Sequence, residues 1–109
     1  MVQSFEVRGK VQGVMFRKTL IQAALKRGLE AGATNDKDVP SRVEFTLAGD
    51  EGKILELITQ LIKGSDLNSW GAKVSELNEL ESLIDLSNHE VTTENVDEQN
   101  FSTGVEFFI

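Results

Sequence analysis

Arg17 stands at an unusual place, at the expected start of a helix and behind a turn that contains Gly9 and Gly13. A helix N-terminus has partial positive charge and unpaired backbone N–H groups, so an arginine there costs stability unless an anion is present. Glycines allow the left-handed backbone angles of an amide nest, which can bind phosphate. The turn and Arg17 therefore predict an anion site. The alternative is an ordinary turn with Arg17 on the solvated face of the helix.

Other catalytic groups are scarce in this chain. It has no cysteine, and its one histidine, His89, lies in an acidic stretch where we expect it to be exposed. No set of residues has metal-ligand spacing, and the turn lacks the Gly-Lys-Ser/Thr ending of a P-loop and the third glycine of a dinucleotide fingerprint. We expect no cofactor and no metal. Phosphoryl transfer, which depends on positioning and charge stabilisation, suits such an inventory.

The charge and composition of the 109 residues exclude several classes of partner. A net charge of −7 argues against nucleic acid, because a backbone binder needs a basic face. No apolar run is long enough to span a bilayer, and we expect no leader before the first strand. We expect a single cytoplasmic domain over residues 1–109 that acts as a monomer, with no membrane partner.

The hydrophobic pattern predicts two helices among several strands. Residues 4–11 and 43–47 alternate, as in strands with one buried face, and residues 17–27 have helical spacing that ends at Gly28. A second helix is expected between the capping residue Asp50 and Gly64. Weaker strands are expected at residues 29–34, 72–77 and 104–109. The order βαββαβ plus a C-terminal strand predicts a ferredoxin-like α+β sandwich, with both helices on one face of an antiparallel sheet.

Residues from about 80 to 102 do not follow this pattern. They are rich in Glu, Asp, Asn, Ser and Thr, and they contain no glycine or proline. We interpret them as an acidic insertion, a solvated excursion between the last two strands. A partner-binding arm is the alternative.

Residues 9–17, GKVQGVMFR, resemble the signature of the acylphosphatase family, G-x-V-Q-G-V-x-F-R. Residues 28–35, GLEAGATN, resemble that family's G-L-x-G-W-V-x-N segment, and the interval from Arg17 to Asn35 matches the interval between its two catalytic residues. The turn at residues 48–50 and the closing GVEFFI also resemble the family's pattern. The resemblance covers about residues 4–79 and 104–109.

The resemblance implies the same sandwich and an activity, the metal-independent hydrolysis of small acyl phosphates to carboxylate and inorganic phosphate. Arg17 would clamp the phosphate and Asn35 would orient the attacking water. The phosphate oxygens would be bound by five backbone amides, those of Gln12, Gly13, Val14, Met15 and Phe16. The alternative is a non-catalytic phosphate-binding or protein-interaction module on the same fold.

Several positions depart from the family's pattern, among them Ala31, which stands where the family has glycine. Gly32 stands where the family has tryptophan, so another side chain must fill that space, and Phe45, Phe108 and Trp70 are the candidates. Asp36 stands where the family has threonine, and its carboxylate is expected to repel a dianionic substrate.

Overall fold

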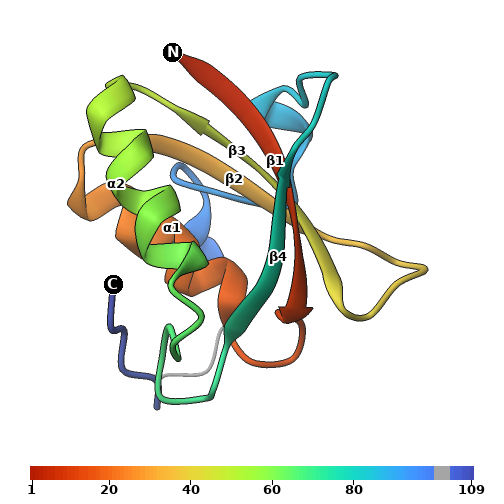
Figure 1. The fold of residues 1–109 in the computed structure, drawn as a ribbon. Helices are drawn as coiled ribbons and strands as arrows, with labels where there is room; N and C mark the ends of the chain where they lie inside the picture. Colours follow the sequence, from red (N-terminus) through yellow and green to blue (C-terminus); the bar gives the residue numbers. More distant parts are fainter. Residues whose placement is uncertain (100–103) are drawn as a thin grey trace.

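Two helices pack on one face of a five-stranded antiparallel sheet in the computed structural model, which describes residues 1–99 and 104–109 (Figure 1). The strands have the spatial order β4-β1-β3-β2-β5. The elements are β1 (Val2–Lys10), α1 (Phe16–Lys26), β2 (Glu30–Asn35), β3 (Arg42–Ala48), α2 (Glu51–Ile62), β4 (Lys73–Glu79), the 3₁₀ helix η1 (Leu86–Asn88), β5 (Val91–Thr92) and the 3₁₀ helix η2 (Val96–Glu98). This arrangement confirms the predicted ferredoxin-like α+β fold.

The core follows from the alternation in β1 and β3. The two strands pair with Phe5 opposite Phe45 and Val7 opposite Val43, and all four side chains are buried on the helix side. The rings of Phe5 and Phe45 stack with centroids 5.1 Å apart. Leu20 of α1 is fully buried on the same side. The helices thus need only one apolar stripe each.

The helix ends have the expected capping residues. The side chain of Asp50 accepts a hydrogen bond from Lys53 N at 3.0 Å at the start of α2. Gly28, with φ of 72°, follows the last turn of α1, where Leu29 N donates to Ala24 O at 2.9 Å. This left-handed cap turns the chain directly into β2. Among the described residues, no helix is long and apolar enough to cross a membrane.

The predicted C-terminal strand is wrong. The fifth strand is β5, which pairs with β2 and occupies the sheet edge that a terminal strand would need. Residues 104–109 instead lie beside the segment that follows α2, where Phe107 forms an isolated bridge with Asn68 and Phe108 N donates to Leu67 O at 3.0 Å. Phe108 remains 55% exposed, so the apolar composition of this segment does not reflect a buried strand.

The segment after β4 packs on the helix-free face of the sheet. We call residues 80–99 the acidic segment; residues 100–102 of the predicted excursion lie outside the described residues. Ile84 N donates to Ser4 Oγ at 2.9 Å, and Thr46 Oγ1 donates to Ile84 O at 2.7 Å. Val91 and Val96 are buried. The expectation of a solvated excursion is therefore wrong in part: the segment bonds to the sheet and buries His89, Val91 and Val96, although most of its other side chains are exposed.

Candidate active site

The turn between β1 and α1 has left-handed backbone angles at two positions. Gly13 has φ of 75°, and Met15, the N-cap of α1, has φ of 61°. A positive φ costs energy for a residue with a Cβ atom, and such conformations concentrate at functional sites. Within the described part of the chain, the backbone amides of residues 12–16 donate to no carbonyl or side chain. The turn therefore presents a set of N–H donors at the N-terminus of α1.

Asn68 holds this turn from the core side. Its side chain is fully buried, and its Nδ2 donates to Val14 O at 2.8 Å and to Thr19 Oγ1 at 2.7 Å. Thr19 Oγ1 in turn donates to Met15 O at 2.7 Å. These bonds point the carbonyls of Val14 and Met15 into the protein. Sequence reasoning missed both residues, since neither stands in a motif.

Gln12 ties the turn to the loop between β2 and β3. Its Nε2 lies 2.9 Å from Asp36 O and 2.8 Å from Arg42 O. Gly9 allows close approach on the other side, because a Cβ there would lie 2.5 Å from Lys73 O. Gln12 thus has a positioning contact through its side chain, in addition to the backbone role that the sequence predicts.

Arg17 and Asn35 meet at one cavity of about 200 Å³. Its lining residues are Val11, Gly13, Met15, Phe16, Arg17, Asn35 and Trp70. The structure thus places five of the predicted site residues around one space, while the Val14 side chain is buried in the core. Asn35 Oδ1 is buried and accepts no hydrogen bond from any described residue. A buried acceptor of this kind requires a donor, and a water molecule or a ligand hydroxyl in the cavity can supply one.

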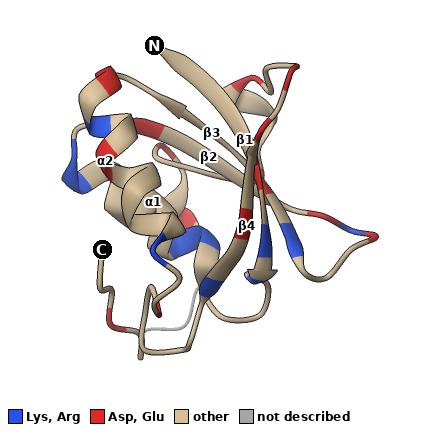
Figure 2. Ribbon diagram, in the orientation of Figure 1, with Lys and Arg blue, Asp and Glu red and all other residues tan. Residues whose placement is uncertain are grey.

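The electrostatic setting of the cavity differs from that of the whole chain. Although the net charge is −7, several Lys and Arg residues lie at the end of the sheet where β1 leads into α1 (Figure 2). Lys10 and Lys73 are paired neighbours on β1 and β4, and Arg17 and Lys18 lie in the first turn of α1. An anion at the turn therefore meets locally positive charge.

The acidic segment also contacts two residues that line this cavity, Arg17 and Asn35. Glu90 Oε1 accepts a hydrogen bond from the backbone N–H of Asn35 at 2.9 Å and forms an ion pair with Arg17 Nη1 at 3.3 Å. Sequence reasoning missed Glu90, since it lies among many acidic residues and in no motif. One carboxylate therefore connects both of the predicted catalytic residues.

The Asp36 carboxylate, which was expected to face the substrate, is bound within its own loop. Its Oδ1 accepts from Asp38 N at 2.8 Å and Val39 N at 3.1 Å, and its Oδ2 accepts from Arg42 Nη1 at 3.0 Å. These backbone hydrogen bonds, together with Arg42, lower the pKa of the Asp36 carboxyl. Asp36 belongs to the loop and does not line the cavity. The carboxylate that contacts Arg17 is that of Glu90.

His89 fills the space beside Gly32. It is 7% exposed, and its Nδ1 lies 2.9 Å from Thr34 Oγ1 and its Nε2 2.8 Å from Thr46 Oγ1. Burial lowers the pKa of the imidazole, which favours the neutral ring. The expectation of an exposed histidine is thus wrong, because the acidic segment brings His89 onto the sheet.

None of the three aromatic candidates fills this space. Phe45 points to the helix side, Phe108 is largely exposed, and Trp70 lines the Arg17 cavity. Trp70 is held there by its indole N–H, which donates to Gly104 O at 2.8 Å.

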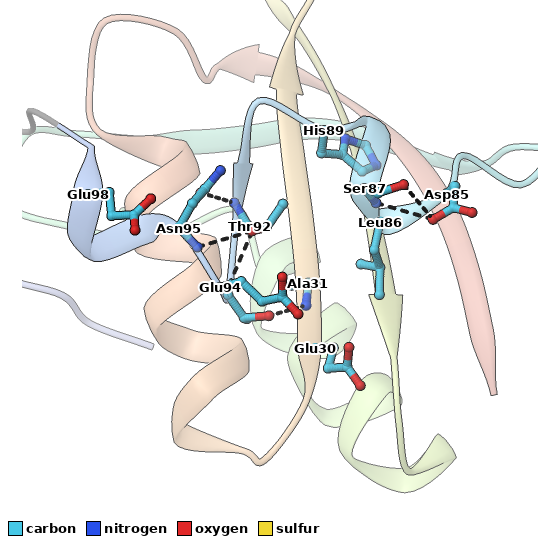
Figure 3. Close-up of a pocket in the computed structure, with 11 residues that line it drawn as sticks. Glu30, Ala31, Asp85, Leu86, Ser87, His89, Thr92, Glu94, Asn95 and Glu98 are labelled. Carbon is cyan, nitrogen blue, oxygen red and sulfur yellow. Dashed lines mark hydrogen bonds between the residues drawn. The ribbon is translucent and has the colours of Figure 1, made fainter.

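A second cavity, of about 510 Å³, lies between β2 and the acidic segment. Its walls include the acidic residues Glu30, Asp85, Glu94 and Glu98 (Figure 3). Hydrogen bonds within the wall, such as those from Ser87 to Asp85, occupy part of this polar surface. It shares no lining residue with the Arg17 cavity, and among the described residues no group of acidic and histidine side chains is placed to hold a metal ion.

Comparisons of the sequence and of the fold with known proteins all find acylphosphatases. The acylphosphatase family model matches residues 3–103. An acylphosphatase of Rhodopseudomonas palustris (strain BisB5) is 38% identical over 63 residues, which are 58% of this chain and 62% of that protein, so the match spans less than two thirds of the relative.

Two solved structures are also similar. The crystal structure of an acylphosphatase from Bacillus subtilis is 32% identical with a TM-score of 0.58, over 82% of this chain and 92% of that one. The structure of an acylphosphatase from Coxiella burnetii is 29% identical with a TM-score of 0.57, and the match covers 79% of this chain and 87% of that one.

Proposed function

The chain belongs to the acylphosphatase family of enzymes, and on that premise we propose that it hydrolyses acyl phosphates to a carboxylate and inorganic phosphate. The observation that supports the proposal is the meeting of Arg17, Asn35 and the β1–α1 turn at one cavity. Arginine, amide and backbone donors are the groups that phosphoryl transfer requires for positioning and charge stabilisation.

The turn and Arg17 bind the phosphate in this proposal. The backbone amides of Gln12, Gly13, Val14, Met15 and Phe16 donate to its oxygens, aided by the positive end of α1. The planar guanidinium of Arg17 donates to the same group, with a geometry that lysine does not reproduce. These donors stabilise the charge on the equatorial oxygens during transfer.

Asn35 orients the nucleophile. Its buried Oδ1 accepts a hydrogen bond from a water molecule, which places the water oxygen in line with the phosphorus. The new P–O bond forms as the bond between phosphorus and the acyl oxygen breaks, and the electron pair leaves with the carboxylate. The water proton passes to a phosphate oxygen of the substrate. Because a carboxylate is a good leaving group, no general acid is needed.

A hydrolysis assay tests the proposal. Wild type is incubated with acetyl phosphate in the presence of EDTA, and inorganic phosphate is followed by ³¹P NMR. We expect hydrolysis by wild type, and Arg17→Ala and Arg17→Lys each to lower kcat/KM by about 10²–10³-fold or more, the scale of losing a donor to the transition state. Arg8→Ala is the matched control, because Arg8 pairs with Glu6 and does not line the cavity.

Two other results would select the alternatives. No hydrolysis, together with phosphate binding that Arg17→Ala abolishes, would identify a binding module. No hydrolysis and no phosphate binding would leave a protein-interaction module on this fold.

A further inference from the structure

We infer that Glu90 is a positioning residue of the active site, one that orients Arg17 and the end of β2 and also weakens the binding of phosphate. The inference rests on the proposed function. It starts from one atom, Glu90 Oε1, which accepts from the backbone N–H of Asn35 at 2.9 Å and from Arg17 Nη1 at 3.3 Å.

The backbone of Glu90 is itself fixed on both sides. Its N–H donates to Thr34 Oγ1 at 3.0 Å, and its carbonyl accepts from Asn95 Nδ2 at 3.2 Å. The preceding residue, His89, is buried against the sheet, and the following residue, Val91, is fully buried in β5. Although the Glu90 side chain is 46% exposed, its backbone is therefore fixed by hydrogen bonds and by the buried residues on either side.

The double contact has a consequence for orientation. Asn35 is the last residue of β2, and its N–H points away from β3 toward the acidic segment, where Glu90 accepts it. The same oxygen restricts the rotation of the Arg17 guanidinium at one nitrogen. A catalytic group held in one orientation loses less entropy when the substrate binds, and displacement by about 1 Å can cost as much as 10²-fold in rate.

The contact also has an electrostatic consequence. A partly exposed ion pair adds little to the stability of the fold, so stability alone does not account for its position. A carboxylate beside the phosphate clamp repels a dianion, and it therefore raises the dissociation constant of phosphate. The two effects can be separated, because glutamine keeps the accepting oxygen and removes the charge.

The test compares Glu90→Ala with Glu90→Gln in the full chain. We expect Glu90→Ala to lower kcat by about 10-fold, and Glu90→Gln to recover most of that loss because its amide oxygen still accepts from both partners. We expect Glu90→Gln to bind inorganic phosphate about 3–10-fold more tightly in calorimetric titrations, the scale of one removed charge near a partly exposed site. A purely structural role would not split kcat from phosphate affinity in this way.

Glu94→Ala and Glu94→Gln are the matched controls. Glu94 lies in the same segment, its side chain is exposed, and it lines the other cavity, so the same charge is removed without the contact. Glu90 variants that match the Glu94 variants in both kcat and phosphate affinity would overturn the inference, as would a Glu90→Gln with the same loss as Glu90→Ala. If wild type does not hydrolyse acyl phosphates, the titration decides alone: tighter phosphate binding by Glu90→Gln supports the role of Glu90, while the proposed function fails.

Discussion

A Cβ atom on Gly32 would lie 2.8 Å from the Cβ and Cδ2 atoms of His89, so the imidazole ring occupies the space that a side chain at position 32 needs. The two residues lie on different elements, β2 and the acidic segment. Where the acylphosphatase pattern has a tryptophan on the strand, this chain has a glycine and brings a histidine from elsewhere. The acidic segment thus supplies packing to the strand that ends in Asn35.

This relationship predicts coupling between the two positions. Gly32→Ala alone should destabilise the protein by about 1–3 kcal/mol, since the new methyl group overlaps the ring. His89→Ala alone should also destabilise, because it removes the packing of the ring and one hydrogen bond from each of Thr34 and Thr46. The double variant should be more stable than the sum of the single effects implies, because the methyl group then enters vacated space.

Urea denaturation measures this cycle. Gly104→Ala is a suitable control, since a Cβ there meets no atom within 4 Å. Strict additivity of the two changes would contradict the packing that we describe.

The buried histidine also predicts a pH dependence of stability. The fold lowers the pKa of His89 below its ordinary value near 6.5, so the unfolded chain takes up a proton first as the pH falls. The stability supplied by the neutral ring is therefore complete above about pH 6.5 and is lost as the pH falls toward the folded-state pKa. The free energy of unfolding, measured in urea between pH 5 and 8, should fall more steeply for wild type than for His89→Gln. His89 is the only histidine, so equal slopes would contradict this account.

Asn68 should matter for both stability and phosphate binding. Asn68→Ala removes the donor to Val14 O and the acceptor, Oδ1, of the N–H of Trp70 and Ala72. Each buried polar group left without a partner costs about 1–3 kcal/mol, so a large loss of stability is expected. The turn amides then lose their fixed direction, and phosphate affinity should fall as well. Asn78→Ala, on the exposed face of β4, should change neither quantity, and equal effects of the two variants would argue against a support role for Asn68.

Much of the fold could be predicted from the sequence because its signals are local. β1 and β3 contain alternating buried residues, and α2 follows Asp50, whose side chain caps the helix. β5 has only two residues, too few for a period, and it forms because β2 offers an edge. The C-terminal segment shows the opposite case, since it has strand-like composition but β5 already occupies the edge beside β2.

The candidate site also has parts with a local sequence signal and parts without one. The turn sequence and the interval between Arg17 and Asn35 could be recognised in the chain, and the structure brings both residues to one cavity. The contacts of Glu90 and Asn68 could not be recognised, because each joins residues that are far apart in the sequence and meet only in the fold. His89 could not be placed either, since its pocket exists only when the acidic segment lies on the sheet beside Gly32.

The central claim is that Arg17 binds the phosphate while Asn35 acts on the water. The most direct measurement is therefore kcat for acetyl phosphate, alongside the dissociation constant of inorganic phosphate, for Asn35→Ala. Truncating this side chain leaves the backbone N–H that donates to Glu90 in place. We predict a fall in kcat of about 10²-fold or more with phosphate affinity within about 3-fold of wild type, whereas Arg17→Ala loses both. Unchanged turnover by Asn35→Ala would contradict the assignment.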